Sequence, residues 1–136
     1  MNKIVVPAKI DALDEVLAFI EKDLEAKDCN LKVQMQIAIA AEEIFVNIAQ
    51  YAYEKKDGEV VIHCDFNSEP GAVTITFTDN GVPYNPLIKE DPDISQSAED
   101  RKIGGLGIYM VKKSMDKVQY ENRNHQNILT IVKKIS

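Results

Sequence analysis

A glutamate and an asparagine four residues apart, in the stretch AAEEIFVNIAQYAY, are the first candidates for chemistry. Four residues make about one turn of an α-helix, so Glu43 and Asn47 would project from one face, and Tyr51 would extend that stripe by another turn. A carboxylate can orient or deprotonate an attacking hydroxyl, and an amide oxygen is a suitable ligand for Mg²⁺. The alternative is an ordinary solvated helix face.

The second candidate is an aspartate at the end of a strand-like run, in TFTDNGVPYNP. Asn80-Gly81 is a common hairpin turn, yet Pro83 and Pro86 prevent a following strand from pairing normally. Asp79 could instead accept a hydrogen bond from the exocyclic amine of a flat ring such as adenine. Gly81 would then leave space for that ring. The alternative is a tight turn without a ligand.

Three glycines in four residues precede a helix-like run in IGGLGIYMVKKSMD. Gly104, Gly105 and Gly107 would expose successive N–H groups at a helix N-terminus, where the helix dipole favours anions such as phosphate. The segment is neither a P-loop nor a dinucleotide-binding fingerprint, because both Gly-Lys-Ser/Thr and the G-x-G-x-x-G spacing are missing. The alternative is a hinge for the long loop before it.

Hydrophobic periodicity predicts the elements that would position these segments. We expect helices over residues 11–26, 31–53 and 106–115, and strands over 2–10, 60–66, 72–78, 117–122 and 127–135. Asp11 is expected to cap the first helix, and Pro7 indicates that the first strand lies at an edge. Elements in this order predict an α+β fold, a two-layer α/β sandwich with helices on one face of a mixed, mainly antiparallel sheet.

Length, charge and cysteine use narrow the class of protein. The 136 residues suit a single domain over 1–136, and the net charge of -6 argues against nucleic acid as a partner because phosphates require a basic face. Lysines and arginines are scattered, so an anionic membrane is not expected either. Cys29 and Cys64 lack metal-ligand spacing, and no signal peptide or long apolar segment is visible, so we expect a cytoplasmic protein.

Taken together and in this order, the three segments resemble the GHKL superfamily of ATPases and kinases, which includes gyrase, histidine kinases and mismatch-repair ATPases. Within it, the chain is similar to the stand-alone anti-sigma factor serine kinases, and the resemblance covers nearly the whole sequence. It implies the Bergerat ATP-binding fold, with ATP and Mg²⁺ as cofactors.

The resemblance also implies a role for each segment. Glu43 would be the catalytic base or polariser, and Asn47 the Mg²⁺ ligand, with Tyr51 on the same nucleotide-facing stripe. Asp79 would bind adenine. The other residues implied to contact the nucleotide are Gly81 and Pro83 beside the base, and Gly104, Gly105, Leu106, Gly107 and Ile108 around the phosphates.

The long segment between these motifs would be the ATP lid, over about residues 87–102. A connection of this length without periodicity is commonly a lid or a disordered segment. Arg101, just before the glycines, could reach the phosphates when the lid closes. A solvated lid charge is the alternative for Arg101.

Two departures from the family pattern stand out. A histidine, a small residue and an aromatic often follow the helix motif, where this chain has Tyr51-Ala52-Tyr53. A Gly-Thr pair often opens the last strand, where the threonine helps to bind adenine indirectly. Asn127 and Ile128 stand there instead, so we assign no adenine-binding role to that strand.

The leading expectation is a Mg-ATP-dependent protein serine/threonine kinase that phosphorylates an anti-sigma-antagonist-like domain, with a sigma factor as a further partner. The alternatives are an ATP-dependent switch that sequesters its partner without chemistry, and a detached histidine-kinase catalytic domain. The last is disfavoured because His63 lies in a strand and His125 in a turn, not in a dimerisation helix. The edge strand near Val5 and Val6 could pair in a homodimer.

Overall fold

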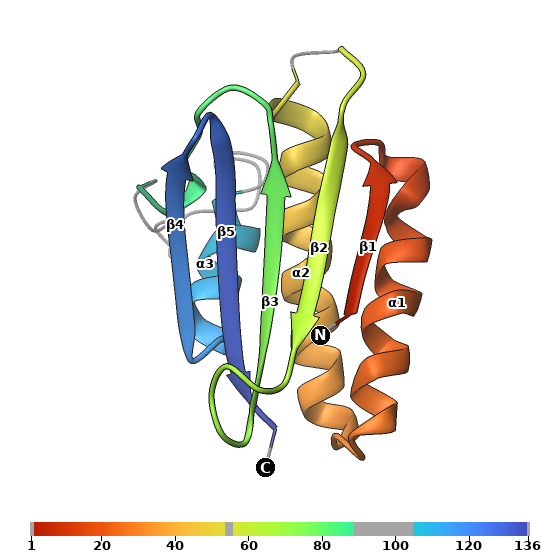
Figure 1. Ribbon diagram of the computed structural model, residues 1–136. Coiled ribbons are helices and arrows are strands. Elements are labelled where there is room, and N and C mark those ends of the chain that lie inside the picture. The colour runs from red at the N-terminus through yellow and green to blue at the C-terminus, as the bar shows by residue number, and fades with distance from the viewer. Residues whose placement is uncertain (1, 54–55, 89–104, 136) are drawn as a thin grey trace.

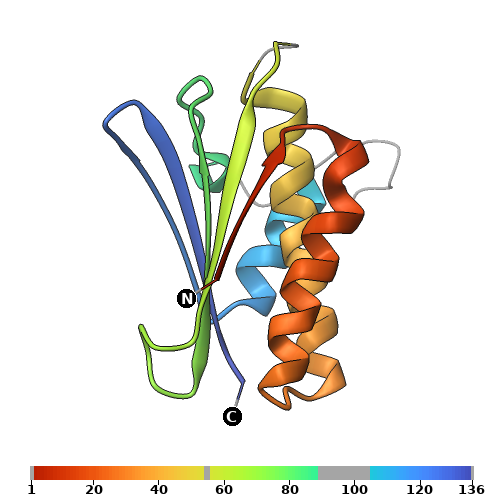
Figure 2. The same cartoon turned by 45° about the vertical axis from the view of Figure 1, so that its right-hand side comes forward.

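The computed structural model describes residues 2–53, 56–88 and 105–135, and within them five strands form one sheet with three α-helices on one of its faces (Figure 1). In chain order these elements are β1 (Asn2–Pro7), α1 (Leu13–Ala26), α2 (Leu31–Tyr51), β2 (Glu59–Asp65), β3 (Ala72–Asp79), α3 (Gly105–Ser114), β4 (Lys117–Arg123) and β5 (Gln126–Lys134). Short 3₁₀ turns lie at Ile10–Ala12 and Pro86–Ile88. Figure 2 shows the two layers edge-on.

The strand order is β1-β2-β3-β5-β4, and every pairing in the described sheet is antiparallel. The predicted α+β two-layer sandwich is therefore confirmed, with an antiparallel sheet in place of a mixed one. β1 lies at an edge, as Pro7 indicated. A tight turn joins β4 to β5 through Asn124 and His125, whose φ angles of 54° and 64° suit a two-residue hairpin loop.

The first helix begins differently from the prediction. Asp11 does not cap it, because the chain enters α1 through the 3₁₀ turn at Ile10–Ala12, where the Ala12 N–H already donates to the Lys9 carbonyl at 3.0 Å. The second helix does have a side-chain cap. The Asn30 side chain accepts a hydrogen bond from the Val33 N–H at 2.9 Å.

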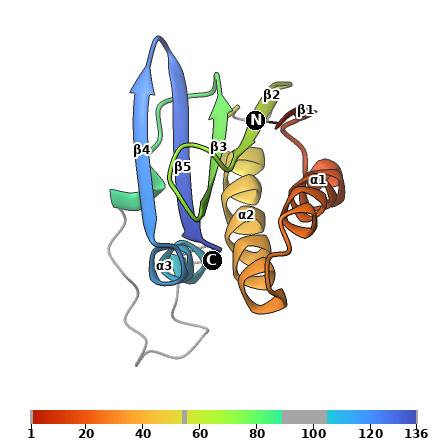
Figure 3. The ribbon, with the colours of Figure 1, turned by 60° about the horizontal axis from the view of Figure 1, so that its bottom comes forward.

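α2 lies beneath the middle of the sheet, between α1 and α3 (Figure 3). The fully buried Phe45 on α2 and Phe77 on β3 belong to one apolar core, and burying each such side chain contributes about 1.5–3 kcal/mol. Both cysteines are buried free thiols. Across the described residues, every helix is too short or too polar to span a bilayer.

Three chain segments that matter for the site meet at one end of the sandwich. The end of β3, the end of α2 and the turn between β4 and β5 all lie toward the top of Figure 1. The antiparallel register places Asp79, the last residue of β3, directly opposite Asn127 on β5.

Candidate functional site

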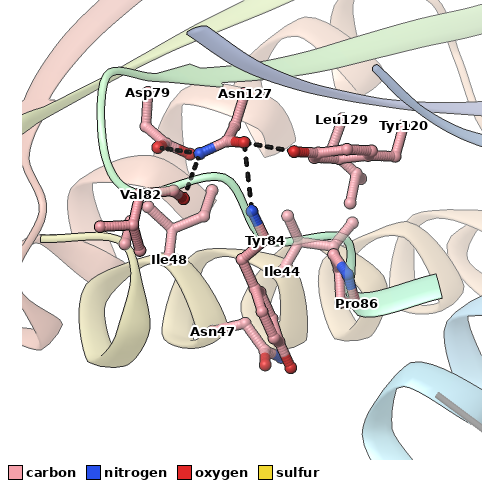
Figure 4. A pocket seen from close by; sticks show the side chains of 11 residues that line it. Ile44, Asn47, Ile48, Asp79, Val82, Tyr84, Pro86, Tyr120, Asn127 and Leu129 are labelled. Atoms are coloured by element: carbon pink, nitrogen blue, oxygen red, sulfur yellow. Dashed lines mark hydrogen bonds between the residues drawn. The ribbon is translucent and has the colours of Figure 1, made fainter. Parts of the chain in front are cut away.

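A pocket opens between α2 and this end of the sheet (Figure 4). Its walls come from α2, from the segment after β3, and from β4 and β5. They are formed by Ile44, Asn47, Ile48, Ala52, Asp79, Val82, Tyr84, Pro86, Tyr120, Asn127 and Leu129. Most of these side chains are apolar, and a few polar groups converge on them, which is the usual composition of a small-molecule site.

Asp79 is the buried carboxylate of this pocket, with 4% of its surface exposed. Its Oδ1 accepts hydrogen bonds from the Gly81 N–H at 2.9 Å and the Asn127 Nδ2 at 3.0 Å, whereas Oδ2 accepts none from the described residues. Burial raises the pKa of Asp79, and these two hydrogen bonds oppose that rise. One carboxylate oxygen is thus fixed by the protein, and the other remains an acceptor for a donor in the pocket.

Asn127 is a site residue that the sequence analysis missed. It is buried, lines the pocket, and links Asp79 to the segment after β3 by donating to the Val82 carbonyl at 2.9 Å. One sequence signal pointed to it: Asn127, Leu129 and Ile131 alternate along β5, so a polar side chain begins the core-facing set.

Gly81 lies beside Asp79, but the reason for a glycine there differs from the expectation. We expected it to leave space for a ring, whereas a Cβ at Gly81 would lie 2.1 Å from the Ala52 carbonyl oxygen at the end of α2. The next residue, Val82, donates its N–H to that same oxygen at 2.7 Å. Glycine is therefore required by the close approach of two backbones. Pro83 is exposed and does not line the pocket.

Asn47 lies in the pocket wall, one helical turn from Glu43. Its Nδ2 donates to the Glu43 carbonyl at 2.8 Å, and within the described part of the chain its Oδ1 accepts no hydrogen bond. Asn47 and Tyr84 both line this pocket, and Figure 4 labels both at its wall. An amide held in this way offers its oxygen as a ligand for a hard cation.

Glu43 meets the first turn of α3. A Cβ at Gly107 would lie 1.8 Å from Glu43 Oε2, so only glycine leaves the carboxylate where it is. Burial raises the pKa of Glu43, and repulsion from the exposed Glu42 adds to the rise. The structure thus brings together the helix motif and the glycine segment, which lie far apart in the sequence.

The remaining predicted site residues fall in different places. Ile108 is a buried side chain of α3. Gly105 and Leu106 belong to the first turn of α3. Arg101, Gly104 and the predicted lid from residue 89 onward lie outside the described residues.

Tyr51 reaches the site indirectly. It is 43% exposed and does not line the pocket, but its ring lies 5.9 Å from that of Tyr84, which does. With Tyr84 in place the pocket has an internal volume of about 30 Å³, room for one or two water molecules. A side chain must therefore move before a ring the size of a purine can enter.

These groups form a line along α2. Asp79 and Asn47 share the pocket, Glu43 is one turn further along the helix, and Gly107 lies against Glu43. The groups in this line fit a magnesium nucleotide. They offer a free carboxylate oxygen for a base, a free amide oxygen for a hard cation, and a helix N-terminus for phosphates.

The sequence comparisons agree with this arrangement. The sequence model of the histidine kinase-like ATPase domain matches residues 6–133. The chain is 34% identical over 99 residues to the serine-protein kinase RsbW of Bacillus cereus, a match that covers 70% of this chain and 59% of that protein. It is 25% identical over 100 residues to the serine/threonine-protein kinase BtrW of Bordetella bronchiseptica, covering 74% and 70%. The chain thus spans about three fifths of the RsbW length.

Solved structures share the fold. The RsbU and RsbW domains of Rv1364c from Mycobacterium tuberculosis superpose with a TM-score of 0.64 at 14% identity, covering 99% of this chain and 33% of that one. The catalytic domain of the histidine kinase ThkA superposes with a TM-score of 0.56 at 15% identity, covering 99% and 98%. The second match extends over almost the full length of both chains.

Proposed function

The chain belongs to the family of histidine kinase-like ATPase domains, and from that membership we propose that it binds Mg-ATP and phosphorylates a serine or threonine of a small protein partner. One observation carries the proposal: four residues follow one another beside or on α2 in the order that a bound nucleotide would require. Asp79 lies where the base would bind, Asn47 where the cation would bind, and Glu43 and Gly107 where the phosphates would lie. The resemblance to serine kinases supports the choice of acceptor.

At the base end, Asp79 Oδ2 accepts a hydrogen bond from the exocyclic amine of adenine. The apolar residues around it, including Ile48 and Leu129, pack against the ring faces. A buried acceptor surrounded by apolar walls discriminates strongly between ligands that carry a matching donor and ligands that do not, because a ligand without the donor leaves the carboxylate unsatisfied.

At the phosphate end, Asn47 Oδ1 would hold Mg²⁺, and the N–H groups in the first turn of α3 would bind the phosphates. No cluster of three or more histidine, cysteine, aspartate or glutamate side chains that could hold a metal occurs in the described ranges. This suits Mg²⁺, which commonly binds through one or two protein ligands together with substrate phosphates. Bound ATP would supply the phosphoryl group, and Mg²⁺ would neutralise part of the phosphate charge.

Glu43 is the general base of the proposed reaction. Its carboxylate accepts the proton of the partner's hydroxyl as that oxygen forms a bond to the γ-phosphorus and the bond to the bridging oxygen of ADP breaks. The raised pKa of Glu43 makes it a better proton acceptor than an ordinary surface glutamate. The protein that is phosphorylated is proposed to be an anti-sigma-antagonist-like domain, with a sigma factor bound as a second partner.

Phosphate transfer from labelled ATP to such a partner tests the proposal. We expect Glu43→Gln to lower the rate about 10²–10⁴-fold, the usual contribution of a general base, while ATP binding changes little. Glu42→Gln is the matched control, because Glu42 is the neighbouring residue and is exposed. Equal labelling by wild type and Glu43→Gln would show that Glu43 is not the base. ATP binding without any labelling would favour a binding switch.

A further inference from the structure

The buried amide of Asn127 is the centre of the hydrogen-bond network in the pocket (Figure 4). It is 5% exposed, and its two polar atoms contact β3, β4 and the segment after β3. Oδ1 accepts from the Tyr120 hydroxyl, from Asn122 Nδ2 at 3.1 Å and from the Tyr84 N–H at 3.4 Å. Nδ2 donates to Asp79 Oδ1 at 3.0 Å and to the Val82 carbonyl at 2.9 Å.

These partners fix the orientation of the amide. A flipped Asn127 would point its NH₂ group at an N–H and at an amide nitrogen, and would point its oxygen at a carboxylate and a carbonyl. Each of those contacts would be repulsive. The observed orientation satisfies both hydrogens of Nδ2 within the protein, so Asn127 has no donor left for a ligand. Asn127 therefore acts on a ligand through the groups that it holds in place, among them the Asp79 carboxylate.

Asp79 is held in a single direction by this arrangement. The Asn127 amide and the Gly81 N–H both bind Oδ1, so Oδ2 is the oxygen left to face the pocket. Among the described residues, Thr74 Oγ1 is the only side-chain polar atom that is both fully buried and without a hydrogen-bond partner. Asp79 Oδ2 also accepts no hydrogen bond from these residues, so it is not fully buried and a ligand can reach it. An oriented, acceptor-only oxygen accepts an amino group and repels a carbonyl oxygen.

We propose that Asn127 is the positioning residue that turns Asp79 Oδ2 toward the base, and that it thereby sets a preference for purines bearing a 6-amino group over purines bearing a 6-oxo group. This inference rests on the proposed binding of ATP. An amide suits the task better than a hydroxyl, because it donates to Asp79 and Val82 at once, whereas a hydroxyl has a single hydrogen to donate.

Calorimetric titration of the full chain with ATP and with inosine triphosphate, which has a 6-oxo group, tests this role. We expect wild type to prefer ATP at least about tenfold. In Asn127→Asp the donor is lost and a second carboxyl faces Asp79, so ATP binding should weaken about tenfold or more at about pH 8 and the preference should fall. Asn67→Asp, which adds the same charge at an exposed turn, should match wild type.

The pH dependence of ATP affinity distinguishes the positioning role, because a purely structural role of Asn127 would leave that dependence unchanged. Two adjacent carboxyls share a proton as the pH falls, so Asn127→Asp should recover ATP affinity toward about pH 6 more than wild type does. The other titratable groups facing this pair are the phenols of Tyr53, Tyr84 and Tyr120.

The outcomes separate this inference from the proposed function. If wild type binds neither nucleotide, both fail. If wild type prefers ATP and Asn127→Asp weakens both nucleotides equally at every pH, the positioning role alone is wrong. Should Asn127→Asp fail to fold, Asn127→Thr retains one donor, and we expect an intermediate ATP preference from it. A preference equal to that of wild type would overturn the inference.

Discussion

Gly107 on α3 lies directly against the carboxylate of Glu43 on α2, so closely that a Cβ at residue 107 would lie 1.8 Å from Glu43 Oε2. This contact joins the glycine-rich segment to the helix motif, and a Cβ at residue 107 would fit only if the Glu43 side chain moved. The obstructing atoms belong to the end of a flexible side chain, not to backbone. A larger residue at 107 would therefore displace Glu43 without breaking the fold.

Replacing Gly107 by alanine should separate activity from stability. Alanine favours a helix by up to about 1 kcal/mol over glycine, so the melting temperature should stay level or rise. The displaced Glu43 carboxylate should lower phosphate transfer about tenfold or more. Thermal unfolding and labelled transfer measured on one preparation check both effects. Undiminished transfer by Gly107→Ala would show that the position of Glu43 does not matter.

Replacing Asp79 by asparagine should change which base is preferred. The new amide oxygen can still accept from the Gly81 N–H and Asn127, which turns an NH₂ group toward the pocket. We expect ATP affinity to fall about tenfold to hundredfold, or about 1.4–2.8 kcal/mol, and inosine triphosphate to lose less or to gain. Calorimetry with both nucleotides gives the comparison, and an unchanged ATP affinity would show that Asp79 does not bind the base.

The raised pKa of Glu43 predicts a stability cost at neutral pH. The folded state binds its proton more tightly than the unfolded state, so this group lowers stability as the pH rises above the ordinary value of 4.5. Glu43→Gln should therefore melt at a higher temperature than wild type at about pH 7, and the difference should vanish in acid, where the carboxyl is protonated in both states. If Glu43→Gln melted at a lower temperature than wild type at neutral pH, that result would contradict the raised pKa of Glu43.

Much of the fold and part of the site could be predicted from sequence because both follow from local periodicity. Helical spacing placed Glu43 and Asn47 on one face of α2, and the β-branched run predicted a strand over 72–78, where the structure has β3. The pairing of Asp79 with Asn127 could not be predicted in this way. These residues are 48 positions apart, and their contact depends on the register between two strands that α3 and β4 separate in the chain.

The reason for Gly81 was also beyond local patterns. Its missing side chain makes room for the Ala52 carbonyl, and that contact exists only once α2 and β3 have docked. A turn signal such as Asn80-Gly81 indicates where the backbone bends. It carries no information about which distant atom the bend approaches.

Tyr84 forms part of the wall of this small pocket, so its removal should enlarge the pocket and speed nucleotide entry. The pocket volume of about 30 Å³ is far below that of a purine, and Tyr84 comes from the loop after β3, whereas Ile44 and Leu129 are core residues. Tyr84→Ala should raise the association rate of a fluorescent ATP analogue severalfold in stopped-flow measurements. The matched change Tyr51→Ala, outside the pocket wall, should have a smaller effect. A slower association in Tyr84→Ala would mean that the ring guides the base inward.

The central claim is that Asp79 and the first turn of α3 serve one bound nucleotide, and amide NMR during an ATP titration tests it most directly. The account predicts that the amide signals of Gly81 and Gly107 both shift and yield the same Kd, whereas adenosine without phosphates shifts Gly81 and leaves Gly107 unmoved. Two different Kd values, or a shift at one glycine alone when ATP binds, would contradict it.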